Sequence, residues 1–266
     1  MIPPLDGHSQ VKRRKGIPMR ALIPNAVTVL ALCFGLTAVR FGIAGEWEKA
    51  VLAIVVAGVL DGIDGRIARL LKGSSRFGAE LDSLSDLTAF GVAPALIVYL
   101  WSLQHVPGLG WVIALAHAVT CALRLARFNA QIDDAPQPHK RAGFLTGVPA
   151  PIGAGLTLAP MAISFWLEPM FLDDLQIRAA VVAVVVVIVS VLMASSVPTY
   201  SWGSVRVRPS ARIAALAGVG LFAGSLFSAP WMTISLMCIA YAVAVPFAWR
   251  SYARAVRRAA ADQPPA

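Results

Sequence analysis

The feature that most constrains this chain is a succession of apolar runs, each long enough to form a helix across a lipid bilayer. A membrane-spanning α-helix needs roughly 20 mostly apolar residues, because each residue adds only about 1.5 Å to its length. Runs of this kind, bounded by charged residues, Pro or Gly, lie at 22–39, 49–71, 82–103, 111–130, 148–167, 178–196, 211–228 and 231–250. The sequence therefore predicts an all-α integral membrane protein, a polytopic helical bundle of about eight transmembrane helices.

The composition excludes the soluble classes of protein. Apolar residues make up 58% of the chain and charged residues 14%, whereas soluble domains have roughly 45–50% and about 25%. The 23 Lys and Arg residues outnumber the 14 Asp and Glu residues. In a membrane protein such a surplus is typical of cytoplasmic loops that face anionic lipid. We therefore expect the lipid bilayer, and no nucleic acid, as the partner of the basic surface.

The positions of the basic residues predict the orientation of the chain. All but Arg40, Lys49 and Arg178 lie near the two ends of the chain or in the even-numbered loops. Because a Lys and Arg excess marks the cytoplasmic side, both termini are expected there, in the cell (inner) membrane. Residues 1–21 then form a basic cytoplasmic or interfacial segment, and residues 251–266 form a basic cytoplasmic tail.

Acidic residues occur where the second predicted span ends and where the third begins. Carboxylates in a membrane-spanning segment are costly, and they mark a functional site by default. The spacing places them on one face of each helix together with residues that have minimal side chains. These residues are Asp61, Asp64, Gly65 and Ala68 on one helix and Gly78, Asp82 and Asp86 on the next. Two antiparallel helices joined by a short loop would present four carboxylates to each other.

Four neighbouring negative charges need compensation, and divalent cations with oxygen ligands provide it. Two such metals can clamp the attacking and leaving oxygens of a displacement at phosphorus. Arg69, one turn beyond Gly65, suits a phosphate oxygen. Two alternatives stay open: the carboxylates pair with nearby arginines at the surface, or the chain is a cation-coupled transporter. Transporters commonly contain inverted repeats, and we find no repeat in this sequence.

The acidic residues also belong to a longer pattern. The chain reads Asp61-Gly-Ile-Asp64-Gly65-Arg-Ile-Ala68-Arg69, then eight residues, then Gly78-Ala-Glu-Leu-Asp82-Ser-Leu-Ser-Asp86. This stretch matches every fixed position of D-x-x-D-G-x-x-A-R-(x8)-G-x-x-x-D-x-x-x-D, the signature of the CDP-alcohol phosphotransferases, and the chain therefore resembles that family. The family consists of membrane enzymes that transfer a phosphoryl-linked group from a CDP-activated donor to an alcohol.

The resemblance implies roles for particular residues. Asp61, Asp64, Asp82 and Asp86 would bind two divalent cations, Mg²⁺ or Mn²⁺, and Asp86 would also be the catalytic general base. The residues expected to line the pocket for CDP-diacylglycerol are Asn25, Thr28, Gly65, Ala68, Arg69, Ser75 and Gly78, with Ser74 as a further contact. The resemblance also implies a homodimer. The family core would comprise residues 22–200 and the first six spans, followed by two additional helices in residues 201–250.

Secondary motifs resemble the membrane-embedded phosphatidylserine synthases within this family. They are Phe90-Gly-Val-Ala-Pro94, Ala126-Arg127-Phe128-Asn129, Gly147-Val-Pro149-Ala-Pro151 and Ser196-Val-Pro-Thr-Tyr200-Ser-Trp202. This resemblance implies a transferase of phospholipid biosynthesis that converts CDP-diacylglycerol and L-serine into phosphatidylserine and CMP. The alternative acceptors are glycerol 3-phosphate and inositol.

The serine carboxylate needs a cation in its pocket. Arg127 is the first candidate, and Arg124, Lys140 and Arg141 are weaker ones. His117, alone in the fourth span, is interpreted as a buried residue that forms hydrogen bonds.

Overall fold

A computed structural model describes residues 19–71, 75–130, 144–167, 173–195, 198–200 and 212–261. The predicted segment 1–18, Ser74, the loop that contains Lys140 and Arg141, Trp202 and the last five residues lie outside the described residues. The helices are α1 (Met19–Ile43), α2 (Trp47–Leu70), α3 (Arg76–Asp86), the π-helical segment η1 (Leu87–Val92), α4 (Ala93–Trp101), the short 3₁₀-helix η2 (Leu103–His105), α5 (Gly110–Ala130), α7 (Ala150–Leu167), α8 (Leu175–Ala194), α9 (Arg212–Ser228) and α10 (Pro230–Ala261).

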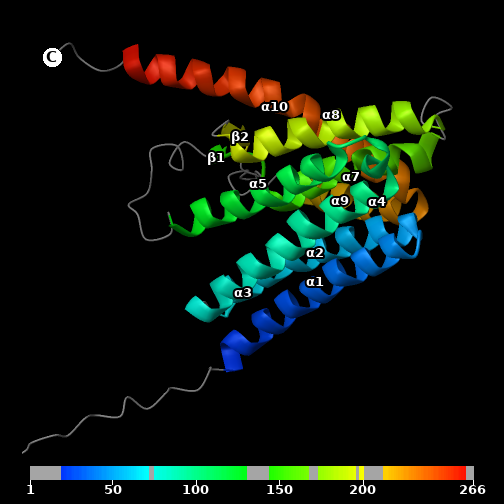
Figure 1. The fold of residues 1–266 in the computed structure, drawn as a ribbon. Helices are drawn as coiled ribbons and strands as arrows, with labels where there is room; N and C mark the ends of the chain where they lie inside the picture. Colours follow the sequence, from blue (N-terminus) through cyan, green and yellow to red (C-terminus); the bar gives the residue numbers. More distant parts are fainter. Residues whose placement is uncertain are drawn as a thin grey trace, which may run out of the picture.

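The prediction of an all-α polytopic membrane protein is confirmed (Figure 1). Each predicted span coincides with a helix, and the third comprises α3, η1 and α4 in succession. Among the described residues, six helical segments are long and apolar enough to cross a membrane. The other two are α2, which carries several charged residues, and α9, which has 17 residues. The count of eight spans stays a prediction.

The sequence did not predict one short pair of strands. β1 (Phe144–Thr146) pairs antiparallel with β2 (Pro198–Tyr200), so that Leu145 lies opposite Thr199. The pair joins the segment before α7 to the segment after α8. It therefore brings two of the predicted secondary motifs together.

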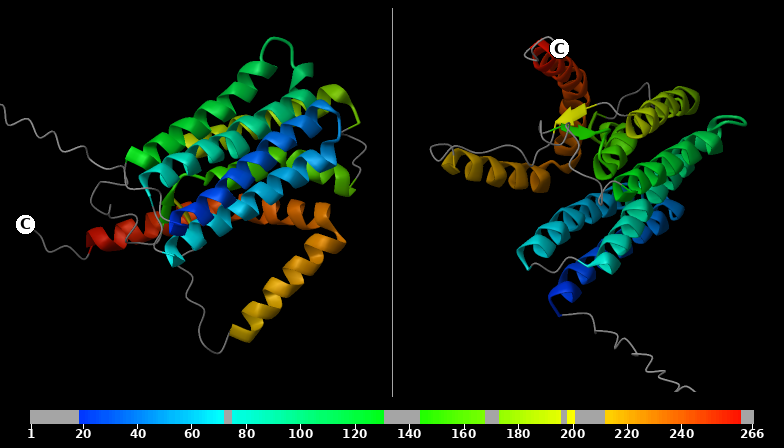
Figure 2. Two further views of the ribbon diagram at one scale, coloured as in Figure 1. Left: turned by 90° about the horizontal axis from the view of Figure 1, so that it is seen from below. Right: turned by 90° about the vertical axis from the view of Figure 1, so that its left-hand side faces the viewer.

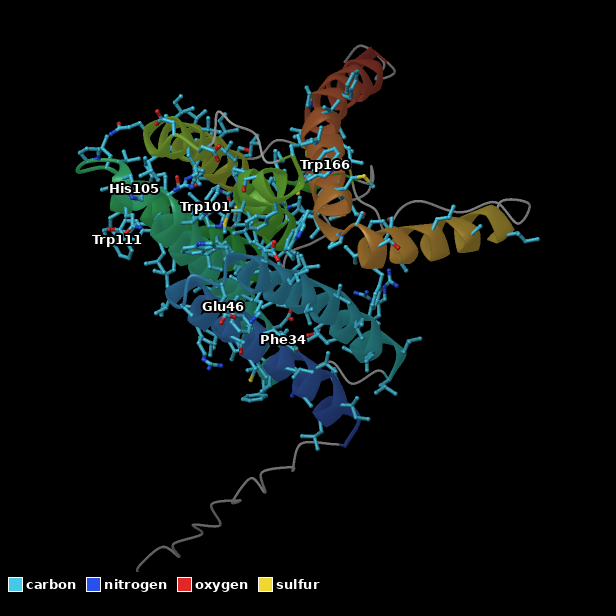
Figure 3. All side chains as sticks on the ribbon, turned by 90° about the vertical axis from the view of Figure 1, so that its right-hand side faces the viewer. Phe34, Glu46, Trp101, His105, Trp111 and Trp166 are labelled. Carbon is cyan, nitrogen blue, oxygen red and sulfur yellow. The ribbon has the colours of Figure 1, made fainter. Side chains whose placement is uncertain are left out.

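The helices alternate in direction, which sorts their connections to two ends of the bundle. The start of α1, the end of α2, the start of α3 and the end of α5 lie at one end, and the α1–α2 and α4–α5 links, the end of α7 and the start of α8 lie at the other (Figures 1 and 2). Arg40, Lys49 and Arg178 are the basic residues that lie away from the expected cytoplasmic side, and two of them have partners at this second end. Lys49 forms an ion pair with Glu46 at 2.6 Å, and Arg178 lies 5.0 Å from the ring centre of Trp101. Trp101, His105 and Trp111 gather around the α4–α5 link (Figure 3).

Small residues allow α1, α2 and η1 to pack very closely. The buried faces of α1 and α2 are rich in alanine, including Ala38, Ala50 and Ala57, which are fully buried. A Cβ atom added at Gly35 of α1 would lie 2.8 Å from the Cα of Ala89 in η1. Close backbone approach of this kind is a common basis of helix association in membranes. Large apolar side chains instead cover the outside of the bundle, as expected for a lipid-facing surface.

The third predicted span is not a continuous α-helix, and Pro94 provides a physical reason. In an α-helix the carbonyl oxygen of Phe90 would accept a hydrogen bond from residue 94, but proline has no N–H and its ring clashes with that carbonyl. The chain instead widens into a π-helical turn, in which the N–H of Ala93 donates to the carbonyl of Thr88, five residues earlier.

This helical stretch also begins before the predicted position 82, because Ser75 caps its first turn at the N–H of Gly78.

The last two helices differ in how they contact the bundle. α10 packs on α7, where Phe165 and Trp231 form an edge-to-face contact with ring centres 4.8 Å apart. α9 projects away from the bundle, with α10 as its main neighbour (Figures 2 and 3). α10 continues to Ala261, so the predicted tail begins as an extension of this helix. The division into a core at 22–200 and two added helices at 201–250 stays a prediction.

The contact between α1 and η1 can be tested with Gly35→Ala. The added methyl group would collide with backbone atoms of Ala89, and overpacking of this kind costs about 1–3 kcal/mol. We expect a lower thermal unfolding midpoint for the detergent-solubilised protein. Gly224→Ala in α9 is the matched control, because a Cβ there meets nothing within 4 Å. Equal midpoints for the two variants would contradict the described packing.

Candidate active site

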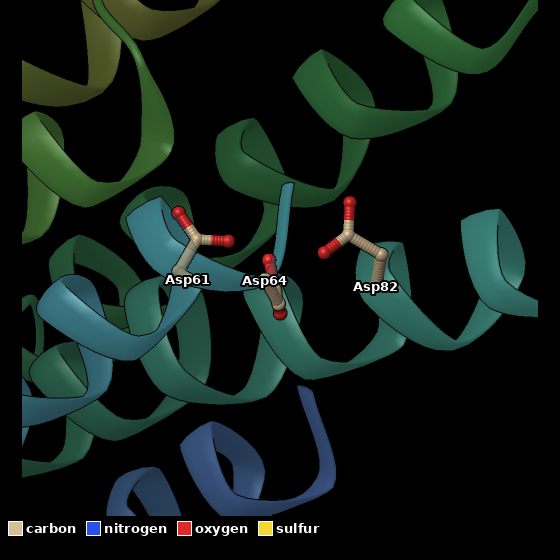
Figure 4. A group of neighbouring side chains, drawn as sticks. All are labelled: Asp61, Asp64 and Asp82. Atoms are coloured by element: carbon tan, nitrogen blue, oxygen red, sulfur yellow. The ribbon is translucent and has the colours of Figure 1, made fainter. Parts of the chain in front are cut away.

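Carboxylates from α2 and α3 meet in one small volume. Asp61 and Asp64 project from α2 and Asp82 from α3 toward the same space (Figure 4). One oxygen atom from each of these three carboxylates lies within 4.8 Å of the other two. The carboxyl group of Asp86, one turn beyond Asp82, lies close enough to Asp61 for their charges to interact. Three of the four predicted carboxylates therefore form one group across the two helices, and the role of Asp86 in a shared site stays a prediction.

The donor set of this cluster fits divalent cations. Opposite ligands of Mg²⁺ lie roughly 4 Å apart, so small side-chain movements would bring three of these carboxylates onto one ion. Within the described ranges, none of the four carboxylates forms an ion pair with Arg66, Arg69 or Arg76. Pairing with surface arginines therefore does not account for the cluster.

α1 contributes a hydrogen bond that fixes one carboxylate. The hydroxyl group of Thr28, which is buried, donates to Asp64 at 2.7 Å and also lies 3.1 Å from the carbonyl of Pro24. Ser85 of α3 donates to the backbone carbonyl of Thr28 at 3.1 Å. The first helix therefore links the two helices that carry the aspartates. Sequence reasoning missed Ser85, although its position between Asp82 and Asp86 was a usable signal.

A pocket of about 150 Å³ opens beside the carboxylates. It is lined by Pro24, Asn25, Thr28, Asp64, Gly65, Ala68, Ser75, Gly78, Ala79 and Asp82. Of the described residues that were predicted to line the donor pocket, all but Arg69 are present. Arg69 is exposed, and its Nη1 lies 3.9 Å from where a Cβ at Gly65 would be, at the edge of the pocket. A Cβ at Gly78 would lie 2.7 Å from Oδ1 of Asn25, so only glycine leaves this wall intact.

The end of α5 reaches the same region. Asn129 donates from its side-chain amide to the hydroxyl oxygen of Ser83 at 2.8 Å, which ties α5 to α3. Arg127, the predicted serine-binding residue, is exposed. Arg124, one turn earlier, is partly buried and close enough to Asp86 for their charges to interact. Its Nε has no hydrogen-bond partner among the described residues. The structure therefore places Arg124 nearer to the carboxylates than the sequence suggested.

Comparison with known proteins agrees with this geometry. Residues 21–249 match the family described as CDP-alcohol phosphatidyltransferase. The chain therefore belongs to this family of membrane enzymes.

The most informative relatives are named CDP-diacylglycerol–serine O-phosphatidyltransferase. The protein of that name from Mycobacterium tuberculosis is 38% identical over 244 residues, which cover 90% of this chain and 81% of the relative. The one from Mycobacterium leprae is 35% identical over 246 residues, covering 90% and 78%. The one from Bacillus subtilis is 35% identical over 150 residues, covering 56% and 79%.

The metal-binding prediction can be tested at Asp82. Asp82→Asn removes a charge from the cluster, and we expect the affinity for Mn²⁺, measured by calorimetry in detergent, to fall at least about tenfold. Glu80→Gln is the matched control, because Glu80 is an exposed acidic residue on the same helix and lies outside the cluster. An unchanged affinity in Asp82→Asn, or an equal loss in Glu80→Gln, would contradict the site.

Proposed function

We propose that this protein transfers the phosphatidyl group of CDP-diacylglycerol to L-serine and releases CMP. The observation that carries the proposal is the group formed by Asp61, Asp64 and Asp82 beside the pocket between α1, α2 and α3. The carboxyl group of Asp86 lies close enough to interact with this group through its charge. The serine acceptor is supported by the names of the mycobacterial relatives, which match 90% of the chain. Family membership disfavours the cation-coupled transporter.

The proposed site holds the donor at its diphosphate. We propose that Asp61, Asp64, Asp82 and Asp86 bind two divalent cations, Mg²⁺ or Mn²⁺. When bound there, such ions neutralise the charge of the diphosphate and of the departing CMP. Asn25, Thr28, Gly65, Ala68, Ser75 and Gly78 would surround the cytidine end, and Arg69 at the edge would bind a phosphate oxygen.

Asp86 is proposed to orient the serine hydroxyl and accept its proton during attack on the phosphorus bonded to diacylglycerol. Breaking the bond between that phosphorus and the CMP oxygen completes the transfer. Much of the rate then comes from positioning and charge stabilisation.

The orientation in the cell follows from charge and topology together. The start of α1, the end of α2, the start of α3 and the end of α5 share one end of the bundle (Figure 1), and most basic residues lie near those segments in the sequence. We propose that this end, with the active site, faces the cytoplasm from the cell (inner) membrane. Homodimer formation stays a prediction drawn from the family resemblance.

The acceptor is tested by measuring CMP release from CDP-diacylglycerol with purified protein in detergent. Parallel reactions contain L-serine, glycerol 3-phosphate or inositol, each with Mg²⁺, Mn²⁺ or EDTA. We expect CMP release when L-serine is the acceptor and Mg²⁺ or Mn²⁺ is present, and no release with the other two acceptors or in EDTA. Release with a different alcohol would contradict serine as the acceptor, and no release with any acceptor would contradict the transferase activity.

The serine carboxylate needs a cation, and the structure favours Arg124 for that role over Arg127. A charge-assisted hydrogen bond contributes about 1.5–3 kcal/mol, which corresponds to roughly 10–100-fold in affinity. We therefore expect Arg124→Gln to raise the KM for L-serine at least about tenfold and to leave the KM for CDP-diacylglycerol within about twofold. Arg127→Gln is the matched comparison and should have the smaller effect. The reverse order would assign serine binding to Arg127.

A further inference from the structure

The backbone carbonyl of Phe90 has lost its usual hydrogen-bond donor. It lies one turn beyond Asp86, within the π-helical segment η1, and its α-helical partner would be residue 94. Pro94 cannot donate, and an unpaired buried carbonyl carries a desolvation cost. Phe90 itself is buried, with 1% of its surface exposed. A donor from elsewhere in the fold is needed to stabilise this turn.

His117 of α5 supplies that donor. Its Nε2 lies 3.1 Å from the carbonyl oxygen of Phe90, and the side chain is fully buried. Because a carbonyl oxygen can only accept, Nε2 must carry the proton. In the neutral ring Nδ1 is then an acceptor, and the hydroxyl group of Thr157 on α7 donates to it at 3.2 Å. The sequence-based interpretation of His117 as a buried hydrogen-bonded residue is confirmed. Its two partners also show that His117 connects η1 to α7.

The same segment is held closely on both sides. Ala89 touches α1 at Gly35, where no side chain fits between the helices. On the opposite side, a Cβ at Gly91 would lie 3.0 Å from the Cβ of Cys121, which is one turn beyond His117 on α5. The backbone of η1 therefore has little freedom to shift, provided that its widened turn is retained.

We propose that His117 is a positioning residue for Asp86. Its bond to the Phe90 carbonyl holds the π-helical turn that begins directly after Asp86, and this turn keeps the Asp86 carboxyl beside Asp61. Thr157 supports the arrangement by fixing which ring nitrogen carries the proton. Asp86 would otherwise rotate or shift with the relaxing turn. This inference rests on the proposed function, because it concerns how the proposed general base is held.

His117→Leu introduces an apolar side chain of similar size and removes both hydrogen bonds. A displacement of about 1 Å at a reacting group can cost on the order of 100-fold in rate. We therefore expect kcat per folded enzyme to fall about 10- to 100-fold, with the KM values for both substrates within about twofold. His117→Gln offers a donor and an acceptor and should recover part of the loss. A kcat within about twofold of the unmodified protein, or a loss expressed only in KM, would overturn the proposal.

Thr157→Val tests the second bond with little change of volume, and it carries the proposal if His117→Leu fails to fold. We expect a smaller decrease of kcat in the same pattern. Thr120→Val is the matched control, because the hydroxyl of Thr120 bonds only to carbonyls of its own helix, at 2.8 and 3.0 Å. The control should keep its kcat. Equal effects of the two valine variants would overturn the role of Thr157.

Pro94→Ala provides the decisive comparison, because it restores a backbone N–H next to the Phe90 carbonyl. In this background the loss caused by His117→Leu should shrink at least about threefold, which is the signature of two groups that share one partner. If His117→Leu lowers kcat by the same factor with and without Pro94→Ala, the two residues act independently and the proposal is overturned. Failure of the proposed function gives a different result from failure of this inference. If the proposed function is wrong, the unmodified protein releases no CMP with L-serine. If only the role of His117 is wrong, the unmodified protein keeps that activity.

Discussion

Four carboxyl groups lie close together between α2 and α3, where their negative charges repel one another. They belong to Asp61, Asp64, Asp82 and Asp86. In water such charges would separate, and in a membrane protein each costs additional desolvation energy. The surrounding helices must therefore oppose this repulsion without a cation, and the cluster gains its greatest stabilisation when cations are bound. The close contacts of α1 and η1 beside the site help to provide this opposition.

Two sets of contacts oppose the repulsion. On the side of α1, Thr28 donates to Asp64 and receives a hydrogen bond at its backbone carbonyl from Ser85. One helix turn therefore ties both aspartate-bearing helices together. On the side of α5, His117 binds the carbonyl that Pro94 leaves without a donor. The same few residues that interrupt a regular helix also create the rigid support that a precisely placed carboxylate needs.

Much of this arrangement could be predicted from the sequence because it depends on local periodicity. Apolar runs give the spans, and the spacing of Asp61, Asp64, Asp82 and Asp86 places them on facing helices. The residues around the pocket were implied by the resemblance to the CDP-alcohol phosphotransferases, and most of them line it.

The remaining features depend on contacts between distant segments, which periodicity does not reveal. The bond from Thr28 to Asp64 joins residues 36 positions apart, and that from His117 to Phe90 spans 27 positions. The π-helical turn depends on Pro94 together with a donor from another helix. The difference in burial between Arg124 and Arg127 likewise depends on how α5 packs against α3.

The proposed mechanism depends on the four carboxylates forming a single site for two neighbouring cations. Electron paramagnetic resonance of the purified protein titrated with Mn²⁺ tests this claim most directly. Two Mn²⁺ ions per chain with a spin-coupled spectrum are expected, because ions that share carboxylate ligands about 3.5–4 Å apart interact magnetically. A spectrum of isolated, uncoupled Mn²⁺ at full occupancy would contradict the shared site.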